Sequence, residues 1–223
     1  MLIGISGMIG SGKSVLSKKL MQYYPSSMML QEFEENDEVF NQFLEWLYKK
    51  TPNLTIGFQS FVVENHTSKL ADLFIKFNEL GKKHNNDHIF LDRFSIEHYI
   101  FASVNLANKS SKYMKAYDAL FSNLITEDET PDLAIYLDVS FETFKKRLFD
   151  RGREVEIKNY AINEQYFKQL HCVYKQIFIE QANKYAMNYI ILDTNNMSED
   201  EVFKQAIKII DNFEFNKMKR FYQ

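Results

Sequence analysis

The sequence predicts an α/β fold in which helices cover both faces of a five-stranded parallel sheet. Five short apolar runs alternate with longer segments that repeat apolar residues at helical spacing, a pattern typical of β–α–β units. The first run leads directly into a glycine-rich motif, Gly7-Met8-Ile9-Gly10-Ser11-Gly12-Lys13-Ser14, and a helical pattern follows it. A strand, a glycine-rich loop and a helix in this order predict a ligand site where the parallel strands end.

The strands are expected at the apolar runs, because strands buried on both faces read as nearly continuous apolar residues. In chain order they are predicted at 2–6, 28–32, 88–92, 133–139 and 189–193.

The helices are expected between these strands, where apolar residues recur every three or four positions. The last one opens with Ser198 and Glu201, which have the spacing of a capping box. In chain order the helices are predicted at 16–24, 37–50, 58–83, 95–105, 112–125, 141–151, 163–185 and 198–212.

The composition is that of one globular domain over residues 1–223. Hydrophobic residues make up 45% of the chain and charged residues 26%, and the chain is long enough to bury a full core. A net charge of −3 predicts no strong attraction to nucleic acid or to an anionic membrane. No apolar run is long enough to span a bilayer, and the chain opens on a strand, which leaves no room for a signal peptide.

The cysteine content suits a cytoplasmic protein. Cys172 is the single cysteine, so an intrachain disulfide is excluded, as expected in a reducing compartment. A lone cysteine of this kind is expected to be a small core residue rather than a nucleophile.

The glycine-rich motif matches G-x-x-x-x-G-K-S, the spacing of a phosphate-binding loop. Its glycines let backbone N–H groups point at phosphate oxygens, and the following helix N-terminus adds partial positive charge. Lys13 is expected to reach the β- and γ-phosphates, and Ser14 to face Mg²⁺. The whole loop from Gly7 to Ser14 is therefore expected to bind a nucleoside triphosphate such as ATP.

Asp92 and Arg93 stand where the third strand is predicted to end. In enzymes with a phosphate-binding loop, a carboxylate at this place helps to hold Mg²⁺ or its waters. Many strands end in an aspartate that only caps a helix, but the matched loop favours the functional interpretation of Asp92. Arg93 is placed either to bind phosphate or to pair with a surface acid.

Three arginines surround a glycine late in the chain. Arg147 and Arg151 are four residues apart and share a helix face, and Gly152 lets the chain turn so that Arg153 joins them. Arginine forks suit the oxygens of a transferring phosphoryl group. The alternative is a solvated helix end whose cations complement the helix dipole.

Glu32 ends the second predicted strand and opens an acidic segment. Most acidic runs are solvated loops. At the carboxyl end of a strand, however, a carboxylate can accept the proton of a hydroxyl that attacks the γ-phosphate.

In this order and spacing the residues resemble the deoxynucleoside kinase family, in particular its bacterial deoxyadenosine kinase-like branch, from Met1 to about Ile191. The family carries Glu-Pro-Val after the second strand, with the Glu as general base; Glu32-Phe33-Glu34 keeps the acid and lacks the proline. The resemblance implies a three-layer P-loop kinase fold with an arginine-rich lid at about 147–158. It also implies a cytoplasmic homodimer, for which the helices at 58–83 and 95–105 could supply the interface.

The resemblance also implies the residues that hold the nucleoside. Tyr48 and Gln59 have the separation of the family's tyrosine, which binds the sugar 3′-hydroxyl, and its glutamine, which pairs with the base. Phe58 and Phe101 match aromatic residues beside the base. Glu156 matches a lid acid that contacts the sugar.

Two departures alter the polar network around the base. The arginine that the family commonly carries seven residues after the glutamine is replaced by His66. The acid that partners this arginine in some members has no clear match, and Glu97 and His98 both lie near the position. The departures leave the preferred base open.

The sequence therefore predicts a kinase that transfers the γ-phosphoryl group of ATP to the 5′-hydroxyl of a deoxynucleoside. Deoxyadenosine is favoured, with other purines or deoxycytidine as further substrates. Glu32 is expected to accept the proton, while Ser14 and Asp92 hold Mg²⁺. The basic residues are expected to contact the donor phosphates or the transferring group: Lys13, Arg93, Arg147, Arg151 and Arg153.

Two other classes of protein share parts of this pattern. A nucleoside monophosphate kinase, such as a thymidylate kinase, would share the loop and the arginines but needs further basic residues for the acceptor phosphate. The series Glu32, Tyr48 and Gln59 argues against it. A non-catalytic GTPase-like switch would carry Asn-Lys-x-Asp, and Asn108-Lys109-Ser110-Ser111 lacks the acid.

Overall fold

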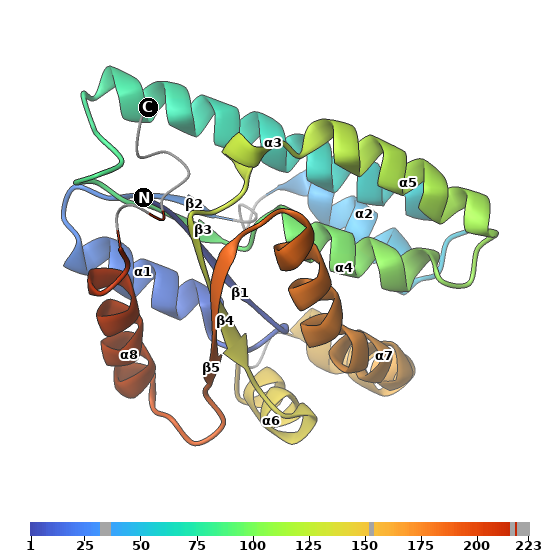
Figure 1. Ribbon diagram of the computed structural model, residues 1–223. Helices are drawn as coiled ribbons and strands as arrows, with labels where there is room; N and C mark the ends of the chain where they lie inside the picture. Colours follow the sequence, from blue (N-terminus) through green and yellow to red (C-terminus); the bar gives the residue numbers. More distant parts are fainter. Residues whose placement is uncertain (32–36, 152–153, 215–216, 218–223) are drawn as a thin grey trace.

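A five-stranded parallel sheet forms the centre of the molecule (Figure 1). The computed structural model describes residues 1–31, 37–151, 154–214 and 217. The strand order is β2-β3-β1-β4-β5, so β1 lies in the middle with β3 and β4 as its neighbours. The predicted fold class is confirmed. The strands are β1 (Leu2–Gly7), β2 (Met28–Gln31), β3 (Ile89–Asp92), β4 (Leu133–Asp138) and β5 (Asn188–Asp193).

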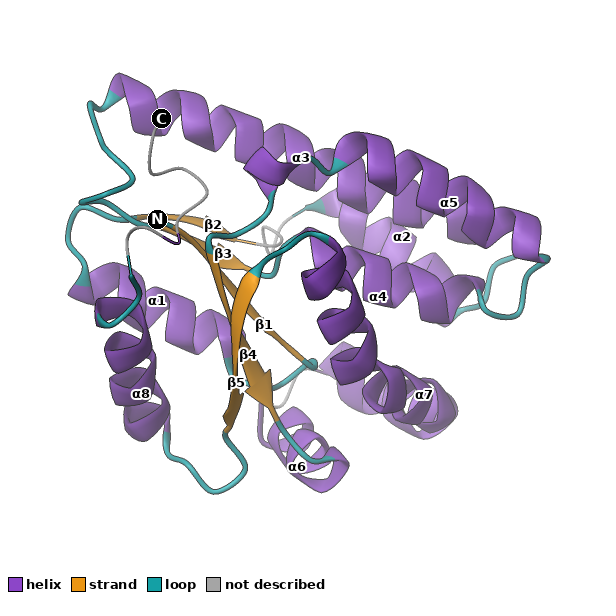
Figure 2. Ribbon diagram, viewed as in Figure 1, coloured by secondary structure: helices purple, strands orange, loops and turns teal. Residues whose placement is uncertain are grey.

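Helices cover both faces of this sheet, as Figure 2 shows. One face carries α1 (Lys13–Tyr23) and α8 (Glu199–Asp211), which pack against each other. On the other side lie the remaining helices: α2 (Glu38–Tyr48), α3 (Thr55–Glu79), α4 (Ser95–Leu106), α5 (Ser111–Leu124), α6 (Phe141–Arg151) and α7 (Glu154–Lys184).

The alternation of side chains along β1 divides the core into two layers. Ile3 and Ile5 point to the α1/α8 layer, whereas Leu2 belongs to the layer beneath α3, α4 and α7. Gly4 faces the second layer, where a Cβ would lie 2.6 Å from the Phe94 ring and 2.8 Å from Pro131. Only a glycine leaves room for this contact between β1 and the start of α4.

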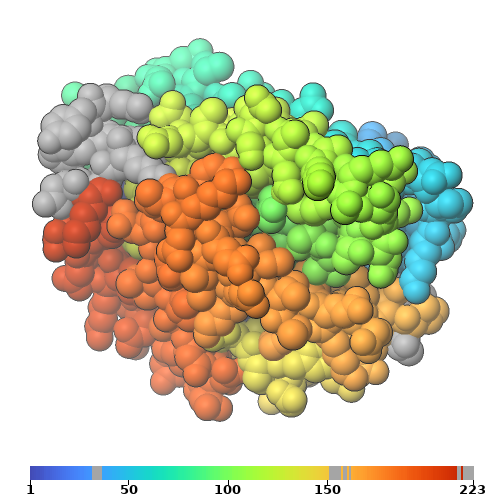
Figure 3. Space-filling view, turned by 45° about the vertical axis from the view of Figure 1, so that its right-hand side comes forward, coloured from blue at the N-terminus to red at the C-terminus, as the bar shows by residue number. Residues whose placement is uncertain are grey.

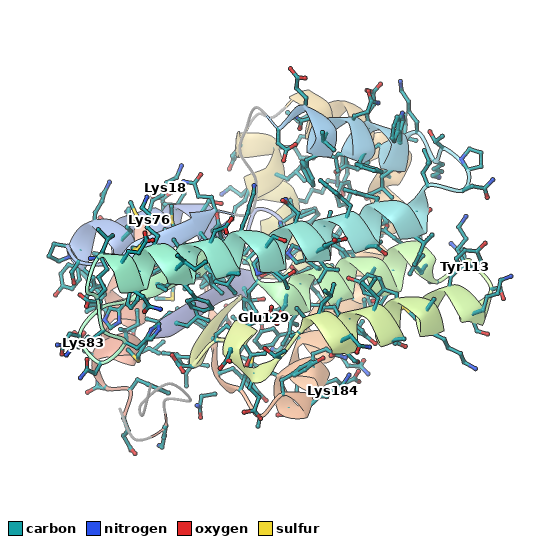
Figure 4. The ribbon with its side chains drawn as sticks, turned by 90° about the horizontal axis from the view of Figure 1, so that it is seen from above. Lys18, Lys76, Lys83, Tyr113, Glu129 and Lys184 are labelled. Atoms are coloured by element: carbon teal, nitrogen blue, oxygen red, sulfur yellow. The ribbon has the colours of Figure 1, made fainter. Side chains whose placement is uncertain are left out.

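Helix α3 lies across the molecule beside α5, and Lys76 of α3 and Tyr113 of α5 lie toward opposite ends of this pair (Figure 4). Figure 3 shows α5 and α7 spread over one face of the molecule. Helix α4 packs against α3, α5 and α7, and none of its residues is exposed. The expectation that the helices at 58–83 and 95–105 supply a dimer interface stays a prediction.

Most helix ends lie within three residues of the predicted ones. Asp37 caps α2 by accepting a hydrogen bond from Phe40 N at 2.9 Å, and the capping box of Ser198 and Glu201 is present. The clearest error is α7, which begins at Glu154 rather than near 163. No glycine or proline lies between Glu154 and Lys184, so nothing in the chain stops the helix from starting early.

Two further observations concern the surface. Cys172 is exposed on α7, so the expectation that it is a core residue is wrong. Within the described ranges, no helix is long and apolar enough to cross a membrane.

Candidate active site

The phosphate-binding loop joins β1 to α1 at the carboxyl edge of the sheet. Gly7 ends β1 with φ 144°, and a Cβ there would lie 2.6 Å from the carbonyl oxygen of Leu137. Gly10 and Gly12 also have positive φ, and Ser11 N donates to Met8 O at 3.0 Å. The loop thus has the tight backbone turn that its glycines predict.

Lys13, the first residue of α1, is buried in its own loop. Its Nζ donates to Gly7 O at 2.5 Å and to Met8 O at 3.1 Å, and lies 3.7 Å from Glu97 Oε2. Ser14 is exposed on the first turn of α1. The ammonium group therefore lies beside the loop's backbone, and the hydroxyl is open to a ligand.

Asp92 ends β3, in register with Ile5 of β1 and Gln31 of β2. Its Oδ1 is buried and, among the described residues, has no hydrogen-bond partner. A buried carboxylate oxygen with spare capacity fits a hard cation such as Mg²⁺. Within the described chain no three His, Cys, Asp or Glu side chains form a metal cluster.

Arg93 follows Asp92 and has an unusual backbone, with φ 75°. Its Nε lies 2.9 Å from Glu97 Oε2, and its guanidinium lies 4.9 Å from the centroid of the Phe101 ring. The residue predicted to contact phosphate is thus held by a carboxylate and an aromatic face from α4.

Arg147 of α6 lies against the phosphate-binding loop. Its guanidinium donates to Ser11 O at 3.1 Å and to Thr194 O at 2.7 Å, and burial lowers its pKa. It connects the loop to the segment after β5. Arg151 ends α6 and Glu156 lies in the first turns of α7, where the structure describes the backbone; Arg153 and Glu32 lie outside the described residues.

A set of buried polar side chains lies between α3 and α4, which we call the α3–α4 polar cluster: Gln59, His66 and His98. Gln59 and His66 are two helical turns apart on the same face of α3. The His66 and His98 rings meet edge to face, with centroids 4.9 Å apart. Sequence analysis left open which residue stands beside His66, and the structure places His98 there, whereas Glu97 turns toward the phosphate-binding loop.

Both histidines of this cluster are neutral near pH 7. His66 and His98 are 5% and 3% exposed, and within the described chain neither Nε2 has a hydrogen-bond partner. Burial lowers the pKa of His66 to about 4, and burial together with His66 and Arg93 lowers that of His98 well below its usual range. Each neutral ring keeps one donor and one acceptor.

The aromatic residues predicted to flank the base have different surroundings. Phe58 is buried on α3 and stacks on Phe43 of α2, with centroids 5.4 Å apart and an interplanar angle of 6°. Phe101 of α4 is half-buried beneath the Arg93 guanidinium. Tyr48 ends α2 and packs against the core layer that contains α3, α4 and α7. In the structure, Phe101 therefore contacts Arg93, and Phe58 contacts α2.

Sequence reasoning missed the part that Glu97 plays. Its carboxylate is fully buried and accepts hydrogen bonds from Gly7 N at 3.2 Å and Tyr174 OH at 2.8 Å. The available signal was its spacing, since Glu97 follows Arg93 by four residues and lies in the first turn of α4, the helix that begins just after Arg93. Tyr174 comes from α7 and gave no signal in the sequence.

Comparisons with known proteins agree with this geometry. A family model described as deoxynucleoside kinase matches residues 3–214. An uncharacterised protein of Mycoplasma genitalium is 30% identical over 197 residues, covering 86% of this chain and 82% of that protein. A deoxyguanosine kinase of Lactobacillus johnsonii is 26% identical over 182 residues, covering 78% of this chain and 75% of that protein.

A solved structure shares the fold. A structure of deoxyadenosine kinase from M. mycoides superposes with a TM-score of 0.74 at 24% identity, covering 96% of this chain and all of that one. The family model spans the sheet, the phosphate-binding loop and the α3–α4 polar cluster. This chain belongs to the deoxynucleoside kinase family.

Proposed function

We propose that this kinase transfers the γ-phosphoryl group of ATP to the 5′-hydroxyl of a deoxynucleoside, with deoxyadenosine as the preferred acceptor. One observation carries the proposal: contacts lead from the phosphate-binding loop to Arg93, whose charge acts on His98 of the α3–α4 polar cluster. Gly7 and Lys13 contact Glu97, Glu97 pairs with Arg93, and Arg93 lies close enough to His98 to lower its pKa. A donor site and a site for a polar, flat acceptor therefore share one edge of the sheet.

The donor triphosphate would lie on the loop from Gly7 to Ser14. The loop N–H groups and the N-terminus of α1 would bind the phosphates, and Lys13 would move from the loop carbonyls to the β- and γ-phosphate oxygens. Ser14 and Asp92 are the residues that would hold Mg²⁺, which when bound neutralises charge on those oxygens. Arg93, Arg147, Arg151 and Arg153 would surround the transferring group, the last three as part of a lid at about 147–158.

The acceptor would lie between α3 and α4. Glu32 follows Gln31, which is in register with Asp92, and would take the proton from the 5′-hydroxyl. Tyr48 and Glu156 would bind the sugar, and Phe58 and Phe101 would flank the base.

The amide of Gln59 would hydrogen-bond the base. An amide offers a donor and an acceptor together, and so does each neutral imidazole of His66 and His98. Adenine presents both an amino group and a ring nitrogen, which this mixed set can satisfy. Cytosine presents the same pair of groups, and guanine presents a carbonyl oxygen beside a ring N–H, so we propose deoxycytidine and other purine deoxynucleosides as further substrates.

The experiment is a phosphoryl-transfer assay with ATP and Mg²⁺ across the four natural deoxynucleosides and their 5′-monophosphates. The proposal expects conversion of deoxyadenosine to its 5′-monophosphate, with little transfer to any monophosphate. Transfer to deoxythymidine monophosphate alone would identify a thymidylate kinase instead. Size-exclusion chromatography with light scattering of the same sample would test the proposed homodimer.

A further inference from the structure

We propose that Glu97 is a positioning residue that couples the donor half of the reaction centre to its acceptor half. The proposal rests on the proposed function for the identity of the two halves. Its basis is that one fully buried carboxylate contacts a backbone amide of β1, a lysine of α1, a tyrosine of α7 and an arginine of the segment between β3 and α4.

On the donor side, Glu97 holds the first glycine of the phosphate-binding loop. Gly7 N donates to Oε1 at 3.2 Å, while Lys13 Nζ lies 3.7 Å from Oε2. The ammonium group is at ion-pair distance from Glu97 but beyond hydrogen-bond distance, whereas it donates hydrogen bonds to two loop carbonyls. Lys13 is therefore the loosest partner of this carboxylate.

On the acceptor side, Glu97 is part of a closed ring of contacts. Its Oε2 lies 2.9 Å from Arg93 Nε and accepts from Tyr174 OH at 2.8 Å. The guanidinium of Arg93 in turn covers the Phe101 ring, which meets the Tyr174 ring edge to face with centroids 6.1 Å apart. Three side chains, Glu97 and Phe101 of α4 and Tyr174 of α7, thus fix the place of Arg93.

The charges of Lys13, Arg93 and Glu97 imply that the contacts among these three side chains change when phosphates bind. Two cations, Lys13 at 5% and Arg93 at 13% exposure, share one carboxylate that is 0% exposed. A bound triphosphate offers Lys13 stronger partners than the carboxylate at 3.7 Å. Lys13 then leaves for the phosphates, whereas Gly7 and Arg93 stay on Glu97. The carboxylate thus competes for Lys13 at rest and keeps Arg93 in place during turnover.

This assignment predicts that Glu97→Gln lowers the turnover rate without weakening the binding of the donor. The amide keeps the shape but removes the charge that competes for Lys13, so MgATP should bind as tightly as in the wild type, or more tightly. Arg93 loses its ion pair, and since a misplacement of about 1 Å costs on the order of 10²-fold, kcat should fall by at least about tenfold. A carboxylate that only stabilised the fold would weaken both together.

The experiment measures the Kd of MgATP by calorimetry and kcat on deoxyadenosine for the wild type and Glu97→Gln. Asp118→Asn is the matched control, because Asp118 also accepts a hydrogen bond from a tyrosine, Tyr99 at 2.7 Å, but lies on α5 away from the loop. The control should leave both constants unchanged. Weaker ATP binding by Glu97→Gln, or a wild-type kcat, would overturn the proposal.

A second variant and a measurement without acceptor keep the test decisive. If Glu97→Gln does not fold, Tyr174→Phe keeps the carboxylate and removes one hydrogen bond; kcat should then fall about fivefold at unchanged ATP affinity, and an unchanged kcat would overturn the proposal. ATP binding needs no acceptor, so the calorimetric half stands even if the wild type phosphorylates no deoxynucleoside. That result would refute the proposed function, and weaker ATP binding by Glu97→Gln would still overturn the role of Glu97.

Discussion

At the scale of single residues, the buried ionisable groups at the carboxyl edge of the sheet offset their loss of hydration in different ways. Glu97 is surrounded by donors, and Lys13 donates to carbonyl oxygens of its own loop. His66 and His98 stay neutral, because a buried imidazole without an acidic partner has a lower free energy in its neutral form than in its charged form. Each compensation leaves a group that a ligand can engage: an ammonium group, a guanidinium and two imidazole nitrogens.

Glu32→Gln tests the proposed proton acceptor. The amide keeps the size of the side chain but cannot take a proton, and a general base contributes about 10²–10⁴-fold. We therefore expect kcat with saturating ATP and deoxyadenosine to fall by that order, with the nucleoside KM nearly unchanged. Glu34→Gln, two residues further on, is the matched control and should keep wild-type kcat. A large effect at Glu34 and none at Glu32 would move the base to the other acid.

His66→Gln tests the neutral histidine pair through acid stability. Because burial lowers the pKa of His66 from 6.5 to about 4, the unfolded chain binds a proton in this range that the folded chain does not. The stability that depends on neutral His66 is complete above about pH 6.5 and is lost as the pH falls toward 4. His98 on α4, Lys69 on α3 and Arg93 beside His98 are the charged or titratable neighbours that oppose protonation.

The measurement is the free energy of unfolding at pH 7 and pH 5 by chemical denaturation. From pH 7 to pH 5 the wild type should lose about 2 kcal/mol more than His66→Gln, the amount that follows from a pKa of about 4 in the fold and 6.5 in the unfolded chain. Equal losses in the two proteins would show that His66 is protonated as easily in the fold as outside it.

At the scale of elements, β1 and α4 are the parts that bring the site together. β1 ends in the phosphate-binding loop, and α4 carries Glu97, His98 and Phe101 on less than two turns. The two elements approach closely at Gly4, where the Phe94 ring fills the space of a missing side chain. This contact is one of those that set the spacing between the phosphate-binding loop and the α3–α4 polar cluster.

Gly4→Ala tests that contact. The added methyl group would lie 2.6 Å from the Phe94 ring, so the chain must shift, and overpacking of this kind costs about 1–3 kcal/mol of folding free energy. Gly57→Ala is the matched control, because a Cβ at Gly57 in α3 meets nothing within 4 Å and should stabilise the protein by about 0.4–1 kcal/mol. Thermal unfolding of both variants measures the contrast, and an equally stable Gly4→Ala would refute the close packing.

At the scale of the whole molecule, the sequence predicted the structure best where a local pattern of residues has a single physical explanation. The five apolar runs predicted the strands and the parallel sheet, because strands that are buried on both faces appear in a sequence as short, nearly continuous apolar runs. The glycine-rich motif predicted the loop for the same reason. The early start of α7 and the exposure of Cys172 were missed, since neither a break nor a strong periodicity marks those positions.

The candidate site was predicted in its local parts and not in its long-range contacts. Lys13, Asp92 and Arg93 were found from their places after strands, and Gln59 and His66 from the family's spacing. The pairing of His66 with His98, and the contacts of Glu97 with Gly7 and Tyr174, join segments up to 90 residues apart. Only the packing of α3, α4 and α7 on the sheet decides which of two neighbouring residues faces which partner.

The most direct test of the central claim, that a nucleoside base lies in the α3–α4 polar cluster opposite the phosphate-binding loop, is the kcat/KM of Gln59→Leu on deoxyadenosine. Gln181→Leu is the matched control, because Gln181 is also a buried glutamine but belongs to α7 and to no part of the proposed site. Removing the Gln59 amide leaves the base without its partner at a cost of about 1–3 kcal/mol. We predict that kcat/KM falls roughly 10- to 100-fold in Gln59→Leu and stays at the wild-type value in Gln181→Leu; wild-type efficiency in Gln59→Leu would contradict the account.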